Sequence, residues 1–211
     1  MPDLTNLYEA ILNGDGKAAV AIAKQALQEG ADPLELVNRQ MIPAMDEAGR
    51  RFEREEYFVP ELLLAARAMK GALELIRPLL AARGDEPVGR VVIGTVKGDL
   101  HDIGKNLIAS MLEGGGFEVI DLGTDVGPER FVQAVREREP HLVCLSALLT
   151  VTMPSMKSTI VALEQAGVRE RVRVVIGGAP VTEEYAREIG ADAYGPNASS
   201  AVPIARRLLG K

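Results

Sequence analysis

The most informative stretch of this sequence is Gly98-Asp99-Leu100-His101-Asp102-Ile103-Gly104. It follows the apolar run 91–93 and precedes a helix-like segment at 105–112. His101, one of 2 histidines, therefore lies in a loop that leaves a strand. From that position an imidazole nitrogen can reach a ligand above the carboxyl end of a sheet. Asp99, two residues earlier, is well placed to hold the other ring nitrogen.

The composition of the chain limits its class. The 211 residues suit one large domain or two small ones, and 47% of them are apolar, which is enough for a substantial core. The net charge of −6 argues against a nucleic acid or an anionic membrane as a partner, because both need clustered lysine and arginine side chains. The single cysteine, Cys144, excludes a disulfide framework within one chain, and its apolar neighbours predict a small buried side chain.

Nothing in the sequence indicates a membrane span or an export signal. No apolar run approaches the roughly 20 residues that cross a bilayer. The N-terminal residues, Met1-Pro2-Asp3-Leu4, are acidic and lack the pattern of a signal peptide. We therefore expect a cytoplasmic protein.

The first predicted domain is residues 1–86, and residues 1 to about 83 have a helical pattern throughout. Its last segment repeats apolar residues at steps of three and four, which predicts one buried stripe. Four helices joined by short loops predict a four-helix bundle. The helices are expected to end at Asn13-Gly14, to span about 15–29, to begin at Asp32-Pro33 with a kink at Pro43, and to start at Pro60. A polar linker follows, Gly84-Asp85-Glu86-Pro87.

The second part of the chain, residues 87–211, alternates short apolar runs with helical segments. Strands are predicted at 90–95, 117–121, 141–147, 172–177 and 192–194, and helices at 103–114, 128–138, 154–166, 182–189 and 198–209. This alternation predicts an α/β domain, with a doubly wound, Rossmann-like parallel sheet of five strands and helices on both faces. The loops 98–104, 146–152 and 177–180 all follow strands, so we expect them at one edge of the sheet.

A nucleotide is the usual ligand of such a sheet, but the motifs for one fit poorly. The dinucleotide fingerprint G-x-G-x-x-G does not occur after the first strand, where residues 94–98 read GTVKG. The phosphate-loop pattern nearly matches between Gly98 and Lys105, yet it has one residue too many. Asn106 also stands where the pattern needs a hydroxyl group for magnesium.

A hydrolytic metal site is a second alternative. Asp99, His101 and Asp102 offer three ligands, but zinc and iron sites usually need others from elsewhere in the chain. The other histidine, His141, starts a strand and is expected at the opposite edge of the sheet. The plain alternative is that His101 caps the following helix or satisfies the loop.

Three sequence elements occur together in a set order. They are Asp99-x-His101-x-x-Gly104, Ser146-x-Leu148 and Gly177-Gly178. This combination resembles the cobalamin-binding signature of proteins in which a histidine replaces the nucleotide base as the lower ligand to cobalt. The helical first part is similar to the cap domain of the same family. The resemblance is to small corrinoid proteins of multi-component methyltransferase systems, acting on methanol, methylamines or methoxylated aromatics, and to the cobalamin-binding module of methionine synthase.

The resemblance implies roles for individual residues. His101 is expected to bind cobalt in the base-off/His-on form, and Asp99 to accept the N–H of its other ring nitrogen. A hydroxyl group completes this relay, from Thr152 or from its rival Thr150. The complete set of expected cofactor-binding residues is Gly98, Asp99, Leu100, His101, Asp102, Ile103, Gly104, Ser146, Leu148, Thr150, Thr152, Gly177 and Gly178.

The displaced nucleotide tail needs a slot between the sheet and its helices. Gly104, Gly177 and Gly178 would let it approach the backbone closely. Ser146 is expected to hydrogen-bond the buried base or its linker, and Leu148 to line the slot. For the paired glycines, a tight turn after a strand is the alternative.

The resemblance also implies that the helical domain shields the upper face of the corrin. The segment 51–60 is similar to the cap of the family, and Phe52 and Val59 align with its covering Phe and Leu. Ordinary packing in the core of the bundle is the alternative for both side chains. The linker at 84–87 is the expected hinge.

We therefore expect a corrinoid methyl carrier. As the resemblance implies, cob(I)alamin takes a methyl group from a substrate-specific methyltransferase, and methylcob(III)alamin passes it to a second methyltransferase that loads tetrahydrofolate or coenzyme M. A reductive activase is a further expected partner. His101 is expected to bind in the cobalt(III) state and to leave in the cobalt(I) state, with Asp99 and the hydroxyl group as the proton reservoir. The residues do not indicate the methyl donor.

Two alternative functions use a similar fold. One is a cobalamin-dependent sensor or photoreceptor, which would carry an effector such as a DNA-binding helix pair. We expect none, because the two predicted domains account for the 211 residues and the chain is acidic. The other is the small subunit of a carbon-skeleton mutase, which generally lacks a helical cap.

Overall fold

The structure is a computed structural model that describes residues 5–84 and 86–211. The chain divides into two compact units. The helical unit consists of Met1–Pro87 together with Ser110–Gly116, and the α/β unit consists of Val88–Ala109 and Phe117–Lys211. Asp85 of the predicted linker lies outside the described residues.

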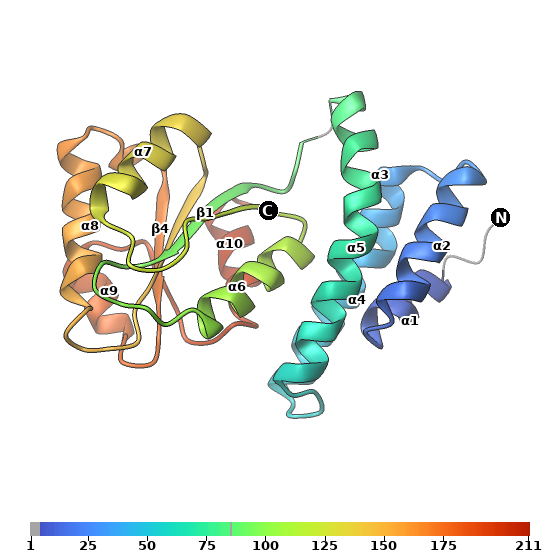
Figure 1. Ribbon diagram of the computed structural model, residues 1–211, viewed down its shortest axis with the longest axis horizontal. Coiled ribbons are helices and arrows are strands. Elements are labelled where there is room, and N and C mark those ends of the chain that lie inside the picture. Colours follow the sequence, from blue (N-terminus) through green and yellow to red (C-terminus); the bar gives the residue numbers. More distant parts are fainter. Residues whose placement is uncertain (1–4, 85) are drawn as a thin grey trace. The chain divides into compact units, whose positions relative to one another are not determined.

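Within the described residues, the helical unit is a bundle of four helices, as predicted, the third of which is made of α3, η1 and α4 in succession. It contains α1 (Thr5–Leu12), α2 (Gly16–Gln28), α3 (Pro33–Leu36), the π-helical turn η1 (Val37–Met41), α4 (Ile42–Glu53) and α5 (Val59–Arg83) (Figure 1). Every one of these elements except α2 contributes at least one large buried side chain: Leu7, Ile11, Leu36, Met41, Met45, Leu62, Met69 and Ile76. None of the described helices combines the length and the hydropathy that crossing a bilayer requires.

The third helical segment begins as predicted and passes through its internal proline. The Asp32 carboxylate accepts hydrogen bonds from the N–H groups of Leu34 and Glu35, at 2.9 and 3.0 Å, which caps the helix. Pro43 is the second residue of α4 and comes two residues after the end of η1. A proline ring clashes with the carbonyl four residues before it, and the wider π-helical turn makes room for that ring. The helix therefore continues from α3 through η1 into α4.

The α/β unit contains five parallel strands, as predicted. The strands are β1 (Arg90–Thr95), β2 (Glu118–Asp121), β3 (Leu142–Ser146), β4 (Arg173–Gly177) and β5 (Ala193–Gly195), in the order β2-β1-β3-β4-β5. The helices are α6 (Ile103–Gly114), α7 (Pro128–Arg138), α8 (Pro154–Gln165), the 3-10 turn η2 (Arg169–Arg171), α9 (Glu183–Ile189) and α10 (Ala201–Leu208). The part of α6 from Ser110 onward belongs to the helical unit.

Helices cover both faces of the sheet. Figure 1 shows α7, α8 and α9 on one face and α6 and α10 on the other. On the first face, Phe131 of α7 and Ile160 of α8 pack in one core with Val92, Val143 and Val174 of the three central strands. This double covering explains the almost continuous apolar runs of these strands.

The register of the strands brings their last residues to one level. Thr95 at the end of β1 pairs with Ser146, Ser146 pairs with Gly177, and Gly177 pairs with Gly195. The side on which successive strands are added changes at β1, because β2 lies on one side of β1 and β3 on the other. Ligands of doubly wound sheets bind at such a switch point.

The turn that ends α4 contains a strained residue. Glu55 has φ 60°, and the N–H of Glu56 donates to the carbonyl of Arg51 at 2.8 Å. This left-handed conformation costs an ordinary L residue roughly 1–2 kcal/mol, whereas glycine adopts it freely.

Glu55→Gly is expected to raise the free energy of unfolding of the helical unit by about 0.5–1 kcal/mol, because it removes this strain. Urea denaturation followed by circular dichroism measures the change. Lys24→Gly, at an exposed position inside α2, is the control and is expected to lower the same quantity by about 1 kcal/mol. Equal losses in both variants would contradict the prediction.

Candidate functional site

His101 lies in the loop between β1 and α6, at the carboxyl edge of the sheet. Its Nδ1 lies 2.9 Å from Oδ1 of Asp99, and 53% of its side chain is exposed. Within the described part of the chain, its Nε2 has no hydrogen-bond partner. Donation from Nδ1–H to the carboxylate leaves the lone pair of Nε2 available to a ligand.

Asp99 is fully buried and joins two loops. Its Oδ1 accepts from the backbone N–H of His101 at 3.1 Å in addition to the ring nitrogen. Its Oδ2 accepts from the N–H of Leu148 at 2.8 Å and from the hydroxyl group of Thr152 at 2.7 Å. Burial opposes ionisation, but these hydrogen bonds outweigh it and hold the pKa of Asp99 well below its usual range. The carboxylate is therefore an anion that orients the imidazole.

Of the two threonines that the sequence left open, Thr152 contacts Asp99. The hydroxyl group of Thr152 lies 2.7 Å from Oδ2 of Asp99 and 2.8 Å from the carbonyl oxygen of Leu149. Its methyl group lies against Gly98, since a Cβ atom there would stand 3.7 Å from it. Thr150 is exposed, and its hydroxyl group has no partner among the described residues.

Two further residues, which were not among the predicted site residues, hold the loop in place. Thr95 is buried at the end of β1 and donates its hydroxyl hydrogen to the carbonyl of His101 at 2.8 Å. Asp125 accepts from the N–H of Gly98 at 2.8 Å and donates its own N–H to the carbonyl of Asp99 at 2.9 Å. A polar residue at the end of an apolar strand could have indicated a structural role for Thr95, but no local pattern indicates one for Asp125.

One face of the sheet is incompletely covered beside this loop. The side chain of Ser146 is half-buried there, and its hydroxyl group has no partner among the described residues. Further half-buried residues form a row with Ser146 on this face: Cys144, Val175, Gly177, Ala193 and Gly195. Of these, only Gly177 was predicted as a site residue, although the alternation of side chains between the two faces of a strand places the others beside it. Burial raises the pKa of the Cys144 thiol to about 12, so this side chain stays neutral.

The three glycines predicted to border the slot have different surroundings. Gly178 has φ 137°, and a Cβ atom there would stand 1.8 Å from the carbonyl oxygen of Ala147, so neighbouring backbone requires glycine. A Cβ atom at Gly177 would stand 3.0 Å from the carbonyl oxygen of Gly195. At Gly104 it would meet nothing within 4 Å. Local packing thus explains Gly178, whereas Gly104 borders open space.

The other predicted residues of the motif lie at the surface around His101. Leu100 and Ile103 are strongly exposed, and Leu148 is exposed to a lesser degree. Asp102 is exposed and accepts a hydrogen bond from the side-chain amide of Asn106 at 3.1 Å. Apolar side chains without cover next to an imidazole offer a surface to an apolar ligand.

In the helical unit, the segment predicted as a cap joins α4 to α5. Phe52 is half-buried near the end of α4. Val59 begins α5 and is exposed, as is Phe58 before it. Val59 therefore does not belong to the core of the bundle, which was the alternative for this side chain.

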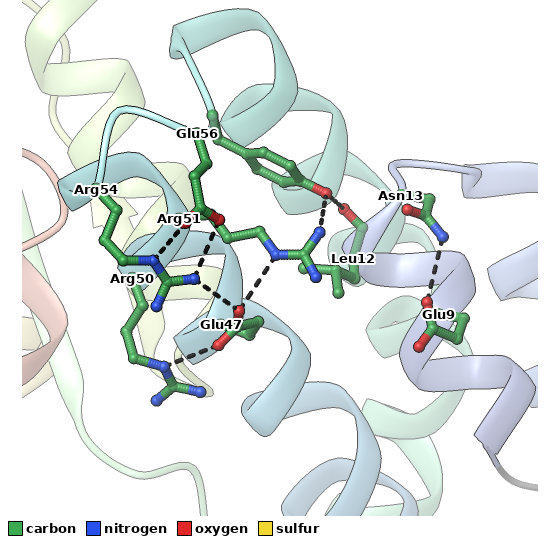
Figure 2. Close-up of polar contacts among 9 residues, drawn as sticks. Glu9, Leu12, Asn13, Glu47, Arg50, Arg51, Arg54 and Glu56 are labelled. Carbon is green, nitrogen blue, oxygen red and sulfur yellow. Dashed lines mark hydrogen bonds and ion pairs between the residues drawn. The ribbon is translucent and has the colours of Figure 1, made fainter.

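Polar contacts hold this segment firmly (Figure 2). Glu47 accepts hydrogen bonds from Arg50, Arg51 and Arg54, at 2.9, 3.2 and 3.2 Å. These bonds hold the pKa of Glu47 below its usual range despite partial burial, and the bond from Arg50 has the largest effect. Arg51 also donates to the hydroxyl group of Tyr57, which in turn donates to the carbonyl of Leu12 in α1. The loop that precedes Phe58 is thereby tied to two helices.

Comparisons with known proteins identify the family. A family described as B12 binding domain matches residues 89–202, and a second family of the same description matches residues 4–77. Trimethylamine corrinoid protein 1 of Methanosarcina acetivorans is 42% identical over 203 residues, which cover 95% of this chain and 94% of the relative. Dimethylamine corrinoid protein 1 of the same organism is 40% identical, over 98% of this chain and 97% of the relative.

The chain is a B12-binding corrinoid protein.

Solved structures agree with this assignment. A cobalamin-binding protein from Desulfitobacterium hafniense DCB-2 is 35% identical with a TM-score of 0.81, and the match covers 99% of each chain. A methanol:cobalamin methyltransferase complex from Methanosarcina barkeri contains a chain that is 28% identical with a TM-score of 0.87. That match covers 99% of this corrinoid protein and 80% of the other chain.

The residues at the carboxyl edge of the sheet fit a corrinoid. A corrin ring supplies four nitrogen ligands to cobalt, so one protein ligand suffices below the ring. His101 presents a single free nitrogen, and no group of three His, Cys, Asp or Glu side chains that could hold a bare metal ion occurs in the described residues. The open space at Gly104 and the unpartnered hydroxyl group of Ser146 on the half-covered sheet face leave room for the remainder of the cofactor.

Gly178→Ala is expected to lower the free energy of unfolding of the cofactor-free protein by about 2–3 kcal/mol, because the added methyl group would overlap the carbonyl of Ala147 in a strained conformation. Gly104→Ala, in the first turn of α6, is the matched control. It is expected to leave this free energy unchanged or to raise it by up to about 1 kcal/mol. Chemical denaturation of both variants tests the contrast, and similar losses would contradict it.

Thr152→Val is expected to lower the free energy of unfolding by about 1–2 kcal/mol, because the buried Asp99 loses a donor while the shape of the side chain is kept. Thr150→Val is expected to change it by less than about 0.5 kcal/mol. Thermal and urea denaturation of the two variants measure the difference. A larger loss for Thr150→Val would contradict the assignment of Thr152 as the hydroxyl group that stabilises Asp99.

Proposed function

We propose that this corrinoid protein carries methyl groups in a methylamine methyltransferase system, and that His101 is the lower ligand to its cobalt. When bound, the corrinoid supplies a cobalt centre that holds a methyl group between two enzymes. Relatives named trimethylamine and dimethylamine corrinoid proteins, at 40–43% identity along almost the whole chain, support the class of methyl donor.

The single observation that carries the role of His101 is its geometry. Nδ1 is held by a buried anion, the side chain is 53% exposed, and Nε2 has no partner among the described residues. A carboxylate on the far nitrogen fixes the tautomer and increases the basicity of a ligating imidazole. Asp99 is itself fixed by Leu148 and Thr152, so the imidazole is oriented before the cofactor arrives.

The half-covered face of the sheet is the proposed slot for the nucleotide tail. Ser146 supplies a free hydroxyl group there, and Gly177 and Gly195 leave the space beside it without side chains. Gly104 keeps the entrance to α6 open, and Leu100 offers an apolar surface beside the imidazole. These residues bind and orient the cofactor.

The proposed partners are enzymes that reach the cofactor in turn. One is a substrate-specific methyltransferase, which the methanol:cobalamin methyltransferase complex among the solved structures supports. The others are a second methyltransferase that loads tetrahydrofolate or coenzyme M, and a reductive activase.

Phe52 and Val59 are proposed to shield the upper face of the corrin, with residues 1–86 as the cap domain and 87–211 as the cobalamin-binding domain. The exposure of Val59 and Phe58 supports a role outside the bundle core.

His101→Ala tests the lower ligand directly, with the other histidine as its control. The full chain is loaded with hydroxocobalamin, reduced to the Co(II) form and studied by electron paramagnetic resonance. Wild-type protein is expected to show splitting from one nitrogen, and His101→Ala to lose it and to bind the cofactor at least about tenfold more weakly. His141→Ala is expected to keep both properties, because His141 accepts from the N–H of Arg90 at the opposite edge of the sheet.

Splitting that persists in His101→Ala would exclude this residue as the ligand.

The donor class is tested separately, by mixing the loaded, reduced protein with methyltransferases specific for trimethylamine, dimethylamine, monomethylamine or methanol. We expect the absorption spectrum to show methylation with a methylamine enzyme and its substrate. Methylation with the methanol enzyme alone would overturn the proposed donor.

A further inference from the structure

Lys105 is a buried cation that no step described above uses. It lies in the first turn of α6, and only 2% of its side chain is exposed. Its ammonium group donates to the side-chain oxygen of Asn106 at 2.6 Å and to the carboxylate of Asp121. Burying an ammonium group is costly unless it is paired and hydrogen-bonded. The other residues of this turn, Ile103 and Gly104, are exposed, so Lys105 anchors the turn.

The two acceptors connect this ammonium group in opposite directions. Asp121 is the last residue of β2, and its second oxygen accepts from the N–H of Gly123 at 2.8 Å. Asn106 donates its side-chain amide to the carboxylate of Asp102 at 3.1 Å. Asp102 directly follows His101 in the chain. A continuous series of polar contacts therefore runs from the end of β2 to the neighbour of the imidazole.

The loop of His101 needs a fixed point at each end. At its N-terminal end, Thr95 holds the carbonyl of His101, and Asp125 holds Gly98. At its C-terminal end the loop runs straight into α6, whose first turn Lys105 ties to β2. Hydrogen bonds between charged groups are directional, so this tie sets the rotation and the axial position of the helix, which apolar contacts leave freer.

We propose that Lys105 is a positioning residue for the lower ligand. Its ion pair with Asp121, extended through Asn106 and Asp102, holds α6 where Nε2 of His101 binds cobalt. Lys105 itself is too buried to touch the cofactor. This inference rests on the proposed role of His101 and adds the element that keeps its imidazole in place.

The test compares three variants of the full chain. Lys105→Met removes the cation and keeps an unbranched side chain. Asp121→Asn removes the charge of the partner and keeps an oxygen that accepts from the N–H of Gly123. Because the side chain of Asp121 is 39% exposed, we expect the fold to tolerate this substitution more easily than Lys105→Met. Lys97→Met is the matched control, because Lys97 also pairs with an aspartate, Asp125, but is 61% exposed.

Two readouts are taken after loading with hydroxocobalamin. They are the dissociation constant and, after reduction, the share of Co(II) with nitrogen splitting in electron paramagnetic resonance. Outer partners of metal ligands typically affect affinity by about 10–100-fold, and we expect about tenfold weaker binding and a smaller split fraction for Lys105→Met and Asp121→Asn. Lys97→Met is expected to match the wild type in both.

Wild-type affinity and wild-type splitting in Lys105→Met and Asp121→Asn would overturn the inference, even with a lowered melting temperature, since the pair would then serve stability alone. If Lys105→Met does not fold, Asp121→Asn decides the question with the same readouts. A loss of affinity in Lys97→Met equal to that in Asp121→Asn would also overturn it. Wild-type protein without nitrogen splitting would instead contradict the proposed role of His101, so the two failures are distinguishable.

Discussion

The buried carboxylate of Asp99 accepts hydrogen bonds from His101 in its own loop and from Leu148 and Thr152 in the loop after β3. Removing a carboxylate from water is costly, and these donors offset that cost so fully that its pKa lies far below the usual range. One anion thus joins the ends of β1 and β3 and fixes the imidazole between them. The position of Nε2 at the switch point of the sheet depends on this contact.

The rest of the loop is arranged around that anion. Thr95 and Asp125 hold the backbone on one side, and Lys105 ties the following helix to β2 on the other. A side chain held by several partners loses little freedom on binding a ligand, which would favour affinity and a single orientation if His101 binds cobalt as proposed. The helical unit has a contrasting design, in which a firmly bonded loop presents the exposed Phe58 and Val59.

The sequence predicted the regular elements well because both periodic patterns were strong. The predicted strands at 90–95 and 172–177 and the predicted helices at 103–114 and 128–138 match the structure within a residue at each end. The effect of Pro43 was not predictable, because a π-helical turn depends on how the surrounding bundle holds the helix. Thr150 and Thr152 were indistinguishable as well, since two hydroxyl groups two residues apart differ only in where the loop turns them.

By itself, the sequence determined the alternation of strands and helices, the position of His101 after the first strand, and the combination of motifs that belongs to the corrinoid family. These features are local patterns, or patterns of spacing along the chain. Only the tertiary structure decided which hydroxyl group reaches Asp99, why Gly178 must be glycine, and that Lys105 is paired with Asp121 rather than free for a phosphate. Such contacts join residues far apart in the sequence, and strand register and helix packing place them.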